Sequence, residues 1–330
     1  MERELNLLTR EESVHRISSF ASEGISFVFL ISFSGEQNLV LKDSEASENG
    51  FFLEMPGKVN HSFPSRRPGR FVFRRYPVKP DHYREAFNMV MEQILYGNSF
   101  LLNLTFPTPI ETSLSLSQIF SGSKAPFKLY LRDRLVIFSP ERFVRIRNNI
   151  ITSNPMKGTM DAATPHAASI LQSDFKEDAE HNTIVDLIRN DLSIISREVR
   201  VKRFKYIEKI RTHQGELLQM SSEIEGVLQE DYRHSLGEML FSLLPAGSIS
   251  GAPKSKTLEI IHTAESCPRG FYTGIFGHFD GENLDSAVAI RYIEKQGRKL
   301  IFRSGGGITS RSNWEKEYEE MISKVYVPVY

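Results

Sequence analysis

The sequence predicts an α+β fold, in which strands pair mainly with antiparallel neighbours. One observation is that strand-like runs follow one another across tight turns, such as the turn in FDGEN at 279–283, which is typical of antiparallel pairing. A second is that helical and strand patterns do not alternate regularly along the chain. A doubly wound parallel sheet would require that alternation, so the α+β class is favoured.

The N-terminal 80 residues are rich in strand patterns. Apolar, β-branched and aromatic residues predict three short strands, at 26–33, 38–41 and 50–53. A segment rich in proline and arginine follows at 64–80. A helix is then expected from Asp81, a good N-cap, to Gly97.

The remaining chain mixes strands with helices. Strand runs are expected at 135–146, 148–159, 273–281, 286–294 and 299–307. Helices are expected at 174–195, 231–244, 254–264 and 312–326.

Composition narrows the classes of partner. The 330 residues carry a formal net charge of zero, which argues against nucleic acid or an anionic membrane as a partner. Arginines interleaved with aromatics at 66–75 could suggest RNA, but this neutrality favours a solvated strand face or linker. The apolar run at 25–33 is too short to span a bilayer, and no signal peptide is evident. The single cysteine, Cys267, fits a reducing cytoplasm and excludes an intramolecular disulfide framework.

Two pairs of glutamates are candidate metal ligands. Glu177 and Glu180 are three residues apart, as are Glu317 and Glu320, so each pair shares one face of an expected helix. If they converge, the four carboxylates would suit a hard cation, most plausibly Mg²⁺. Two solvated charged helix faces are the alternative and, for the pairs alone, the commoner case.

Two glycine-rich loops are candidate anion sites. PAGSISGAPK at 245–254 leads into a helix with Pro253 as its expected first residue, so backbone N–H groups there could face an anion. SGGGI at 304–308 follows a strand and lets the backbone approach a ligand closely. Each could instead be a tight turn. Neither matches the nucleotide patterns GxxxxGK[ST] or GxGxxG.

Four single residues complete the candidate chemistry. Arg291 and Lys324 could pair with substrate carboxylates, or form surface ion pairs. Lys157, between Pro155 and Gly158, could be a nucleophile if desolvated, although an exposed turn lysine is more common. Glu141 in SPERF could be a general acid, or could pair with an arginine.

Taken in order, these segments resemble the chorismate-binding enzymes, a family that includes anthranilate, aminodeoxychorismate, isochorismate and salicylate synthases. The motifs cover about three quarters of the chain: GNSFLLNLT (97–105), SPERF (139–143), NPMKGT (154–159), EDAEHNTIVDLIRNDL (177–192), PAGSISGAPK (245–254), RGFYTGIFGH (269–278), AVAIR (287–291) and SGGGITSRSNWEKEYEE (304–320).

The resemblance implies an anthranilate-synthase-like sandwich of two packed antiparallel sheets surrounded by helices. Residues 1–80 would be a short N-terminal part of that fold and 81–330 the catalytic core. Glu180 and Glu320 would bind Mg²⁺, supported by Glu177 and Glu317, and Glu141 would be the acid. The residues implied in binding chorismate are Thr159, Ser250, Gly251, Ala252, Tyr272, Arg291, Gly305, Gly306, Gly307 and Lys324.

Lys157 decides the branch of the family that the chain resembles. Anthranilate synthases usually have alanine in the corresponding PIAGT loop, whereas aminodeoxychorismate synthases have PIKGT; here the loop is PMKGT. The implied mechanism is attack of this lysine at C2 of chorismate, followed by amination at C4. The implied product is 4-amino-4-deoxychorismate, on the route to 4-aminobenzoate and folate. Leu101 and Gln219 depart from the usual family residues.

The source of ammonia follows from the cysteine count. An amidotransferase of the usual type needs a nucleophilic cysteine with a histidine partner, and Cys267 lies in ESCPRG, outside any such pattern. We therefore expect a separate glutamine amidotransferase subunit. Two other hypotheses stay open: anthranilate synthase component I with an atypical loop, and a catalytically silent binding or regulatory subunit.

Overall fold

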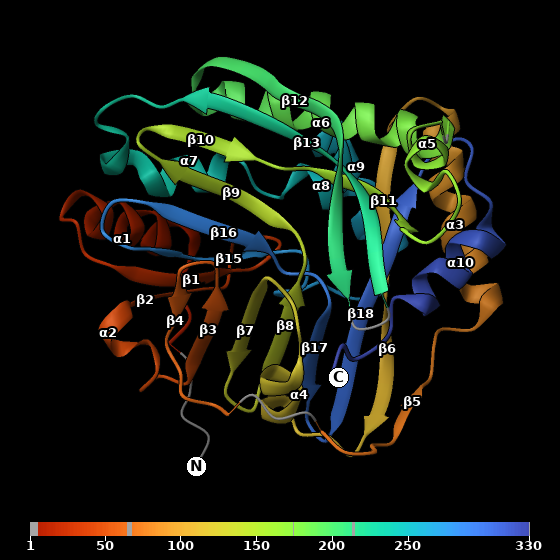
Figure 1. The fold of residues 1–330 in the computed structure, drawn as a ribbon, viewed down its shortest axis with the longest axis horizontal. Helices are drawn as coiled ribbons and strands as arrows, with labels where there is room; N and C mark the ends of the chain where they lie inside the picture. Colours follow the sequence, from red (N-terminus) through yellow and green to blue (C-terminus); the bar gives the residue numbers. More distant parts are fainter. Residues whose placement is uncertain (1–5, 65–67, 174, 213–214, 330) are drawn as a thin grey trace.

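The computed structural model describes residues 6–64, 68–173, 175–212 and 215–329. Within these residues the chain forms two nine-stranded sheets, which lie one above the other in Figure 1. Every named strand pair is antiparallel. The predicted α+β sandwich of antiparallel sheets is therefore confirmed.

The first sheet runs in the order β11-β13-β10-β9-β16-β15-β1-β2, with β12 paired to β13. Its strands are β1 (Phe27–Ile31), β2 (Asn38–Lys42), β9 (Arg142–Arg147), β10 (Ile150–Ser153), β11 (Met156–Asp161), β12 (Arg197–Thr212), β13 (Gly215–Val227), β15 (Ile275–Phe279) and β16 (Leu284–Val288).

The second sheet runs in the order β14-β6-β18-β17-β8-β7-β3-β4, with β5 paired to β6. Its strands are β3 (Phe51–Met55), β4 (Lys58–Val59), β5 (Phe73–Arg75), β6 (Leu101–Thr112), β7 (Phe127–Leu131), β8 (Leu135–Ser139), β14 (Gly251–Ala252), β17 (Tyr292–Gln296) and β18 (Lys299–Ile308). The N-terminal strands therefore extend both sheets.

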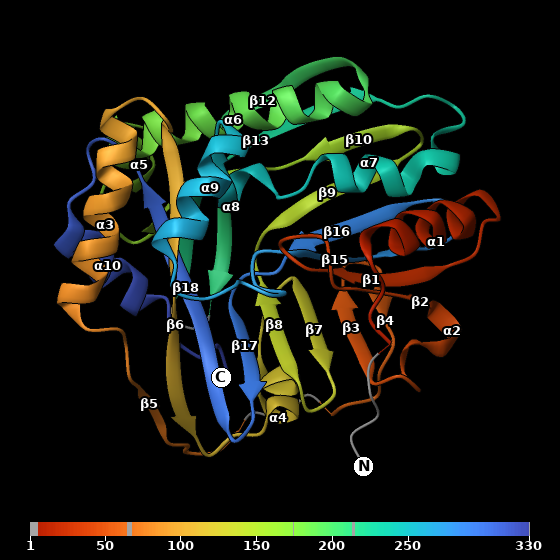
Figure 2. The same ribbon diagram turned by 180° about the vertical axis from the view of Figure 1, so that it is seen from behind.

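Helices cover the outer faces of the sheets (Figure 2), with α1 against α7 and with α3, α9 and α10 beside β6 and β18. The helices are α1 (Arg10–Ser22), α2 (Asp43–Ala46), α3 (Pro80–Leu95), α4 (Leu116–Gly122), α5 (Ala167–Ser173), α6 (Phe175–Ile195), the 3₁₀ turn η1 (Tyr232–Ser235), α7 (Leu236–Ser242), α8 (Gly247–Ser250), α9 (Lys254–Ala264) and α10 (Trp314–Ser323). No helix in the described ranges is long and apolar enough to cross a membrane.

Strand β1 is buried on both faces. Val28 and Leu30 pack between the two sheets, whereas Phe27, Phe29 and Ile31 pack beneath the outer helices. Because side chains alternate along a strand, a continuous apolar run is what a strand covered on both sides requires. This explains why the run at 25–33 is a strand.

Several predicted boundaries are wrong. Helix α3 has Lys79 as its N-cap and Pro80 at its first position, so Asp81 lies inside the helix; proline suits that position because its φ is fixed and it lacks an N–H. Pro253 is the N-cap of α9 rather than its first residue. The expected helix at 231–244 is a 3₁₀ turn followed by α7.

Three predicted strands are each two strands in the structure. The run at 286–294 covers the end of β16 and the start of β17, which belong to different sheets. The run at 135–146 breaks at Pro140, so that β8 belongs to one sheet and β9 to the other. The run at 148–159 breaks at Pro155 into β10 and β11, which both pair with β13. Proline explains the breaks at Pro140 and Pro155, because it cannot donate to a strand ladder.

Candidate active site

The candidate site lies where the chain passes twice from one sheet to the other. The first passage, from β8 to β9, contains Glu141, and the second, from β16 to β17, contains Arg291. The two passages run side by side: the N–H of Phe138 donates to the carbonyl of Arg291 and the N–H of Val288 to that of Glu141, both at 3.1 Å. Residues far apart in the sequence therefore meet at this junction.

A cavity of about 580 Å³ opens at the junction. Segments from both sheets and from α6, α8 and α10 form its wall. The lining residues are Asn103, Pro140, Glu141, Met156, Gly158, Met160, Leu171, Ile184, Gln219, Ser248, Ile249, Tyr272, Ile290, Arg291, Gly305, Gly306, Gly307, Glu320, Ser323, Lys324 and Tyr326. The lining thus includes seven of the residues that the sequence singled out for catalysis or substrate binding, together with Glu320.

The glycine run of β18 faces two carboxylates of α10 and the amine of its C-cap, Lys324. A Cβ atom placed on Gly306 would lie 3.5 Å from Glu317 Oε2, 3.6 Å from Glu320 Oε1 and 3.8 Å from Lys324 Nζ. Lys324 Nζ donates to Glu320 Oε1 at 2.7 Å and to the carbonyl of Gly305 at 2.8 Å. The absence of a side chain at Gly306 therefore leaves open the point on which these three groups converge.

Glu141 is held at the cavity wall by Ser248. The hydroxyl of Ser248, on α8, donates to Glu141 Oε1 at 2.5 Å. The backbone N–H of Glu141 donates to the hydroxyl of Ser139 at 3.2 Å. These contacts fix the carboxyl on the same wall as Arg291, where it can exchange a proton with a bound molecule.

The neighbouring wall carries polar atoms that lack a protein partner. Arg291 Nε and Asn103 Oδ1 are buried, and neither has a hydrogen-bond partner among the described residues. Since buried polar groups are nearly always paired, such atoms in a cavity wall are typical of a ligand site. Tyr272 lies in the same wall, and burial raises the pKa of its phenol to about 12, so the hydroxyl remains a neutral donor at physiological pH.

The glycine-rich loop at 245–254 contributes different residues from those expected. Ser248 and Ile249 line the cavity. Ser250 is buried behind them and its hydroxyl donates to a carbonyl of its own turn. Gly251 and Ala252 pair with β6 as strand β14. The structure does not bring these last three to the cavity surface, because Ser250 is buried in α8 and the other two join the sheet.

Three predicted residues, Lys157, Thr159 and Glu177, have side chains outside the described residues. The backbone of Lys157 and Thr159 belongs to β11, which pairs with β13 and has a register shift between these two residues. The same strand borders the cavity through Met156, Gly158 and Met160. The PMKGT segment is therefore part of the cavity wall.

The four glutamates are only partly brought together. Glu317 is 1% exposed and shares the point above Gly306 with Glu320. Glu180 is buried on α6, one helical turn before the cavity residue Ile184. No group of three or more His, Cys, Asp or Glu side chains that could hold a metal ion occurs in the described part of the chain. The donor chemistry of Glu317 and Glu320, two carboxylates facing one point, nevertheless fits a hard cation.

Sequence reasoning did not single out Asn103, Ser248 or Tyr326, which also line the cavity. Asn103 and Ser248 lie inside the quoted motifs GNSFLLNLT and PAGSISGAPK, and a polar residue in an otherwise apolar strand was a usable signal for Asn103. Tyr326, whose ring centroid is 5.7 Å from the guanidinium of Arg291, lies beyond the last motif. Only tertiary contacts identify it.

Comparison with known proteins gives a consistent result. The model of the chorismate binding enzyme family matches residues 27–329. An uncharacterised PabA-like protein of Pasteurella multocida is 50% identical over 317 residues, which are 96% of this chain and 98% of that protein. Aminodeoxychorismate synthase component 1 of Bacillus subtilis is 28% identical over 319 residues, covering 92% of this chain and 66% of that relative.

A solved structure has the same fold. The crystal structure of anthranilate synthase component I from Streptococcus pneumoniae matches with a TM-score of 0.68 and 27% sequence identity, over 78% of this chain and 59% of that one.

Proposed function

We propose that this chain, which belongs to the chorismate binding enzyme family, converts chorismate and ammonia to 4-amino-4-deoxychorismate. The observation that carries the proposal is a lysine, Lys157, in the strand that borders the cavity through Met156 and Gly158. A primary amine there supplies a nucleophile, which an alanine at the same place would not. The similarity to aminodeoxychorismate synthase component 1 of Bacillus subtilis supports this branch.

The cavity wall supports binding of a dianion. Arg291 and Lys324 supply positive charge, and Tyr272 supplies a neutral hydroxyl donor. We assign to them, with the backbone of Gly305 to Gly307 and the hydroxyl of Thr159, the two carboxylates of chorismate. Charge-assisted hydrogen bonds to carboxylates are the strongest of the available contacts, so they would set the orientation of the ring.

The chemistry then needs two displacements. The amine of Lys157 forms a bond to C2, the ring double bonds shift, and the 4-hydroxyl leaves as water with a proton from Glu141. Ammonia next forms a bond to C4, the double bonds shift back, and the bond between C2 and the lysine nitrogen breaks. The balance is chorismate plus ammonia giving 4-amino-4-deoxychorismate plus water. A single displacement would deliver nitrogen to C2 instead.

We further propose that Mg²⁺ binds beside the glycine run. Glu317 and Glu320 face one point there, with Glu180 on α6 and Glu177 one turn earlier as the remaining ligands. When bound, the cation would neutralise a substrate carboxylate close to these glutamates. The glutamates would otherwise repel that carboxylate.

Ammonia would come from a separate glutamine amidotransferase subunit. Cys267 is the only cysteine of the chain, and the described contact of its sulfur is with Arg303 rather than with a histidine. A glutaminase needs a cysteine activated by a base. The chain would accordingly use ammonium salt directly in the absence of that partner.

Anthranilate synthase component I is the second candidate, favoured by the similarity to the Streptococcus pneumoniae structure. The two functions differ in the ring carbon that receives nitrogen. They share the cavity, the acid and the cation, so the product rather than substrate consumption distinguishes them.

Replacement of Lys157 tests the proposal. The purified chain would be incubated with chorismate, Mg²⁺ and ammonium salt. The product would be identified by mass spectrometry and by its conversion to 4-aminobenzoate with an added aminodeoxychorismate lyase. Lys157→Ala is expected to lower the rate of C4 amination by a factor on the order of 10³. Lys209→Ala, at a half-exposed lysine of β12 paired with Glu216, is the matched control and should leave the rate unchanged.

Two outcomes would contradict the proposal. Anthranilate formed by the wild-type chain would favour the second candidate. A C4 amination rate that is the same in Lys157→Ala and the wild type would show that the lysine is not the nucleophile.

A further inference from the structure

A buried ion pair lies behind the cavity wall, between the end of α9 and the start of β15. Arg269 Nη2 donates to Glu265 Oε1 at 2.6 Å, and Arg269 Nε donates to Glu265 Oε2 at 2.9 Å. The side chains are 1% and 5% exposed, respectively. Burying two charges is costly unless further hydrogen bonds satisfy them. The groups that make those hydrogen bonds are therefore the ones that the pair holds in place.

The guanidinium of Arg269 uses all five of its N–H groups. Besides the two bonds to Glu265, Nη1 donates to the carbonyl of Ile249 at 3.2 Å and to the hydroxyl of Thr273 at 3.3 Å. Nη2 also donates to the carbonyl of Asn103 at 2.5 Å. These acceptors come from β6, α8 and the loop before β15, three segments that are distant in the sequence.

The carboxylate of Glu265 makes a second connection to β6. Its Oε1 accepts from the backbone N–H of Thr105 at 2.9 Å and from the hydroxyl of Thr105 at 3.0 Å. The pair therefore holds β6 at two positions on the same side of the strand, Asn103 and Thr105. A shift of that strand would break contacts to both charges.

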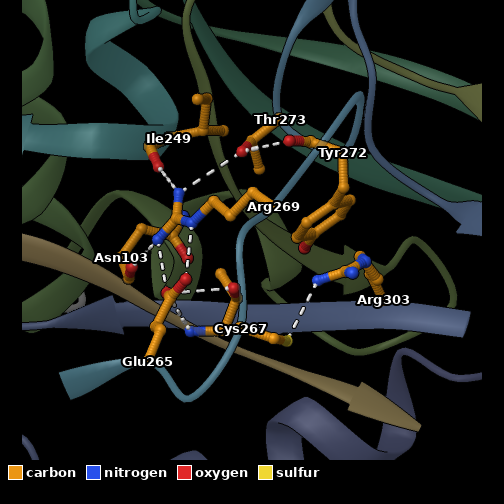
Figure 3. A network of polar contacts seen from close by, with 9 residues as sticks. Asn103, Ile249, Glu265, Cys267, Arg269, Tyr272, Thr273 and Arg303 are labelled. Atoms are coloured by element: carbon orange, nitrogen blue, oxygen red, sulfur yellow. Dashed lines mark hydrogen bonds and ion pairs between the residues drawn. The ribbon is translucent and has the colours of Figure 1, made fainter. Parts of the chain in front are cut away.

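The groups that the pair holds are those that form the cavity wall. Asn103 and Ile249 line the cavity and bond directly to Arg269. Tyr272, also in the wall, donates its N–H to the carbonyl of Arg269 at 3.1 Å, and its own carbonyl accepts from Thr273 at 2.6 Å. Figure 3 shows the guanidinium at the centre of these residues.

On its other side, the pair borders a larger hollow of about 810 Å³, whose wall includes Phe33, Glu265, Cys267 and Arg269. The guanidinium lies 4.5 Å from the ring centroid of Phe33, a cation–π contact that closes this side. The pair is thus a partition between the hollow and the cavity, and its loss would admit water behind Asn103 and Tyr272.

We infer that Arg269 and Glu265 are positioning residues that set where Asn103, Ile249 and Tyr272 stand in the substrate cavity. The inference rests on this cavity being the chorismate site, but not on which carbon is aminated. Neither residue lines the cavity, so both act through the residues they hold.

Position 269 requires the planar guanidinium of arginine, whose N–H groups point in several fixed directions. Lysine keeps the charge and one contact to Glu265, but its three N–H groups on a single nitrogen cannot reach acceptors on three segments. Arg269→Lys is therefore expected to lower kcat/KM for chorismate about 100-fold, because a displacement of about 1 Å in a binding wall has that effect. Arg269→Met should be no more active than Arg269→Lys.

A second buried pair provides the matched control. Arg303 Nε donates to Glu294 Oε1 at 2.8 Å, with side chains 7% and 16% exposed, and neither residue lines the cavity. Arg303→Lys should lower the thermal midpoint as Arg269→Lys does, yet leave kcat/KM within about threefold of the wild type. Glu265→Gln and Glu294→Gln form a milder second set with the same expected contrast.

The measurements are the thermal midpoint, the dissociation constant of chorismate by calorimetry, and kcat and KM for chorismate consumption whatever the product. The inference would be overturned if activity fell in proportion to the thermal midpoint, and by the same amount, in the variants of both pairs. Full activity in Arg269→Lys would also overturn it. If the wild type binds chorismate without C4 amination, the proposed function fails, while at least tenfold weaker binding in Arg269→Lys would still support the inference. Unchanged binding in that case would overturn it too.

Discussion

A single methyl group at Gly306 gives a demanding test of the site. Gly306→Ala would place a Cβ atom 3.5 Å from Glu317 Oε2 and 3.6 Å from Glu320 Oε1, which are ordinary van der Waals distances. Its backbone is not in the left-handed region. The substitution should therefore change the free energy of unfolding by no more than about 1 kcal/mol, in the stabilising direction, because glycine loses more backbone entropy on folding.

The effect on activity should be much larger. The methyl group fills the point on which the carboxylates and Lys324 converge, and a ligand resting on the Gly306 backbone would have to move by about the length of one C–C bond. Since a displacement of about 1 Å costs about 100-fold, kcat/KM for chorismate should fall by that factor, equivalent to about 2.7 kcal/mol of transition-state binding.

The neighbouring glycine supplies the contrast. Gly305→Ala would place its Cβ atom 2.3 Å from the carbonyl of Leu104 and 2.7 Å from Thr105 Cγ2, so the strand itself must shift. This variant should lose up to about 3 kcal/mol of stability. Steady-state consumption of chorismate and denaturant unfolding would be measured for both. If Gly306→Ala folds normally and keeps kcat/KM within about threefold of the wild type, the glycine face is not where substrate rests.

Three further predictions follow from particular contacts. Burial raises the pKa of Tyr272 to about 12, above its unfolded value, so the stability that it contributes is present below pH 10 and is lost as the pH rises toward 12. Tyr272→Phe should reduce this alkaline loss by up to about 1.4 kcal/mol in thermal unfolding between pH 8 and 11, because only about one pH unit of that range lies above the unfolded pKa. Gly237→Ala would place a Cβ atom 2.2 Å from a backbone oxygen of α1 and should cost up to about 3 kcal/mol in urea unfolding, whereas Gly69→Ala, with open space around it, should be neutral. Mg²⁺ at 100 times its dissociation constant should stabilise the wild type by about 2.7 kcal/mol in a thermal shift assay; Glu317→Gln should lose most of this shift and the exposed Glu319→Gln should keep it.

The parts of the fold that the sequence predicts are those governed by local pattern. The continuous apolar run at 25–33 and the Gly97 terminus of α3 are examples, since each follows from neighbouring residues. Helix α1 could also have been found, because Thr9 and Glu12 form a capping box that the sequence displays. It was not among the expected elements, nor was the long hairpin of β12 and β13, although Val199 and Val201 alternate with charged residues along β12.

The sequence predicts a cavity residue correctly where its side chain, or the lack of one, is itself what the site uses. Arg291, Lys324 and the glycines of β18 lie in the cavity as expected. The positions of Gly251 and Ala252 away from the cavity could not be foreseen, because they pair with Leu102 and Leu101 of β6, which are far away in the sequence. Helical spacing predicts which glutamates share a face, but whether the glutamate pairs of two different helices converge depends on tertiary packing, which spacing does not contain.

The most direct test of the account is a search for a covalent intermediate on Lys157. The chain would be incubated with chorismate and Mg²⁺ without any amine donor, and acid would then be added to stop the reaction. The intact protein and its peptides would be analysed by mass spectrometry. The account predicts an adduct with the mass of chorismate less one water, located on the peptide that contains Lys157 and absent from Lys157→Ala. An enzyme that aminates C4 at the normal rate but never carries this adduct, or carries it equally in Lys157→Ala, would contradict the account.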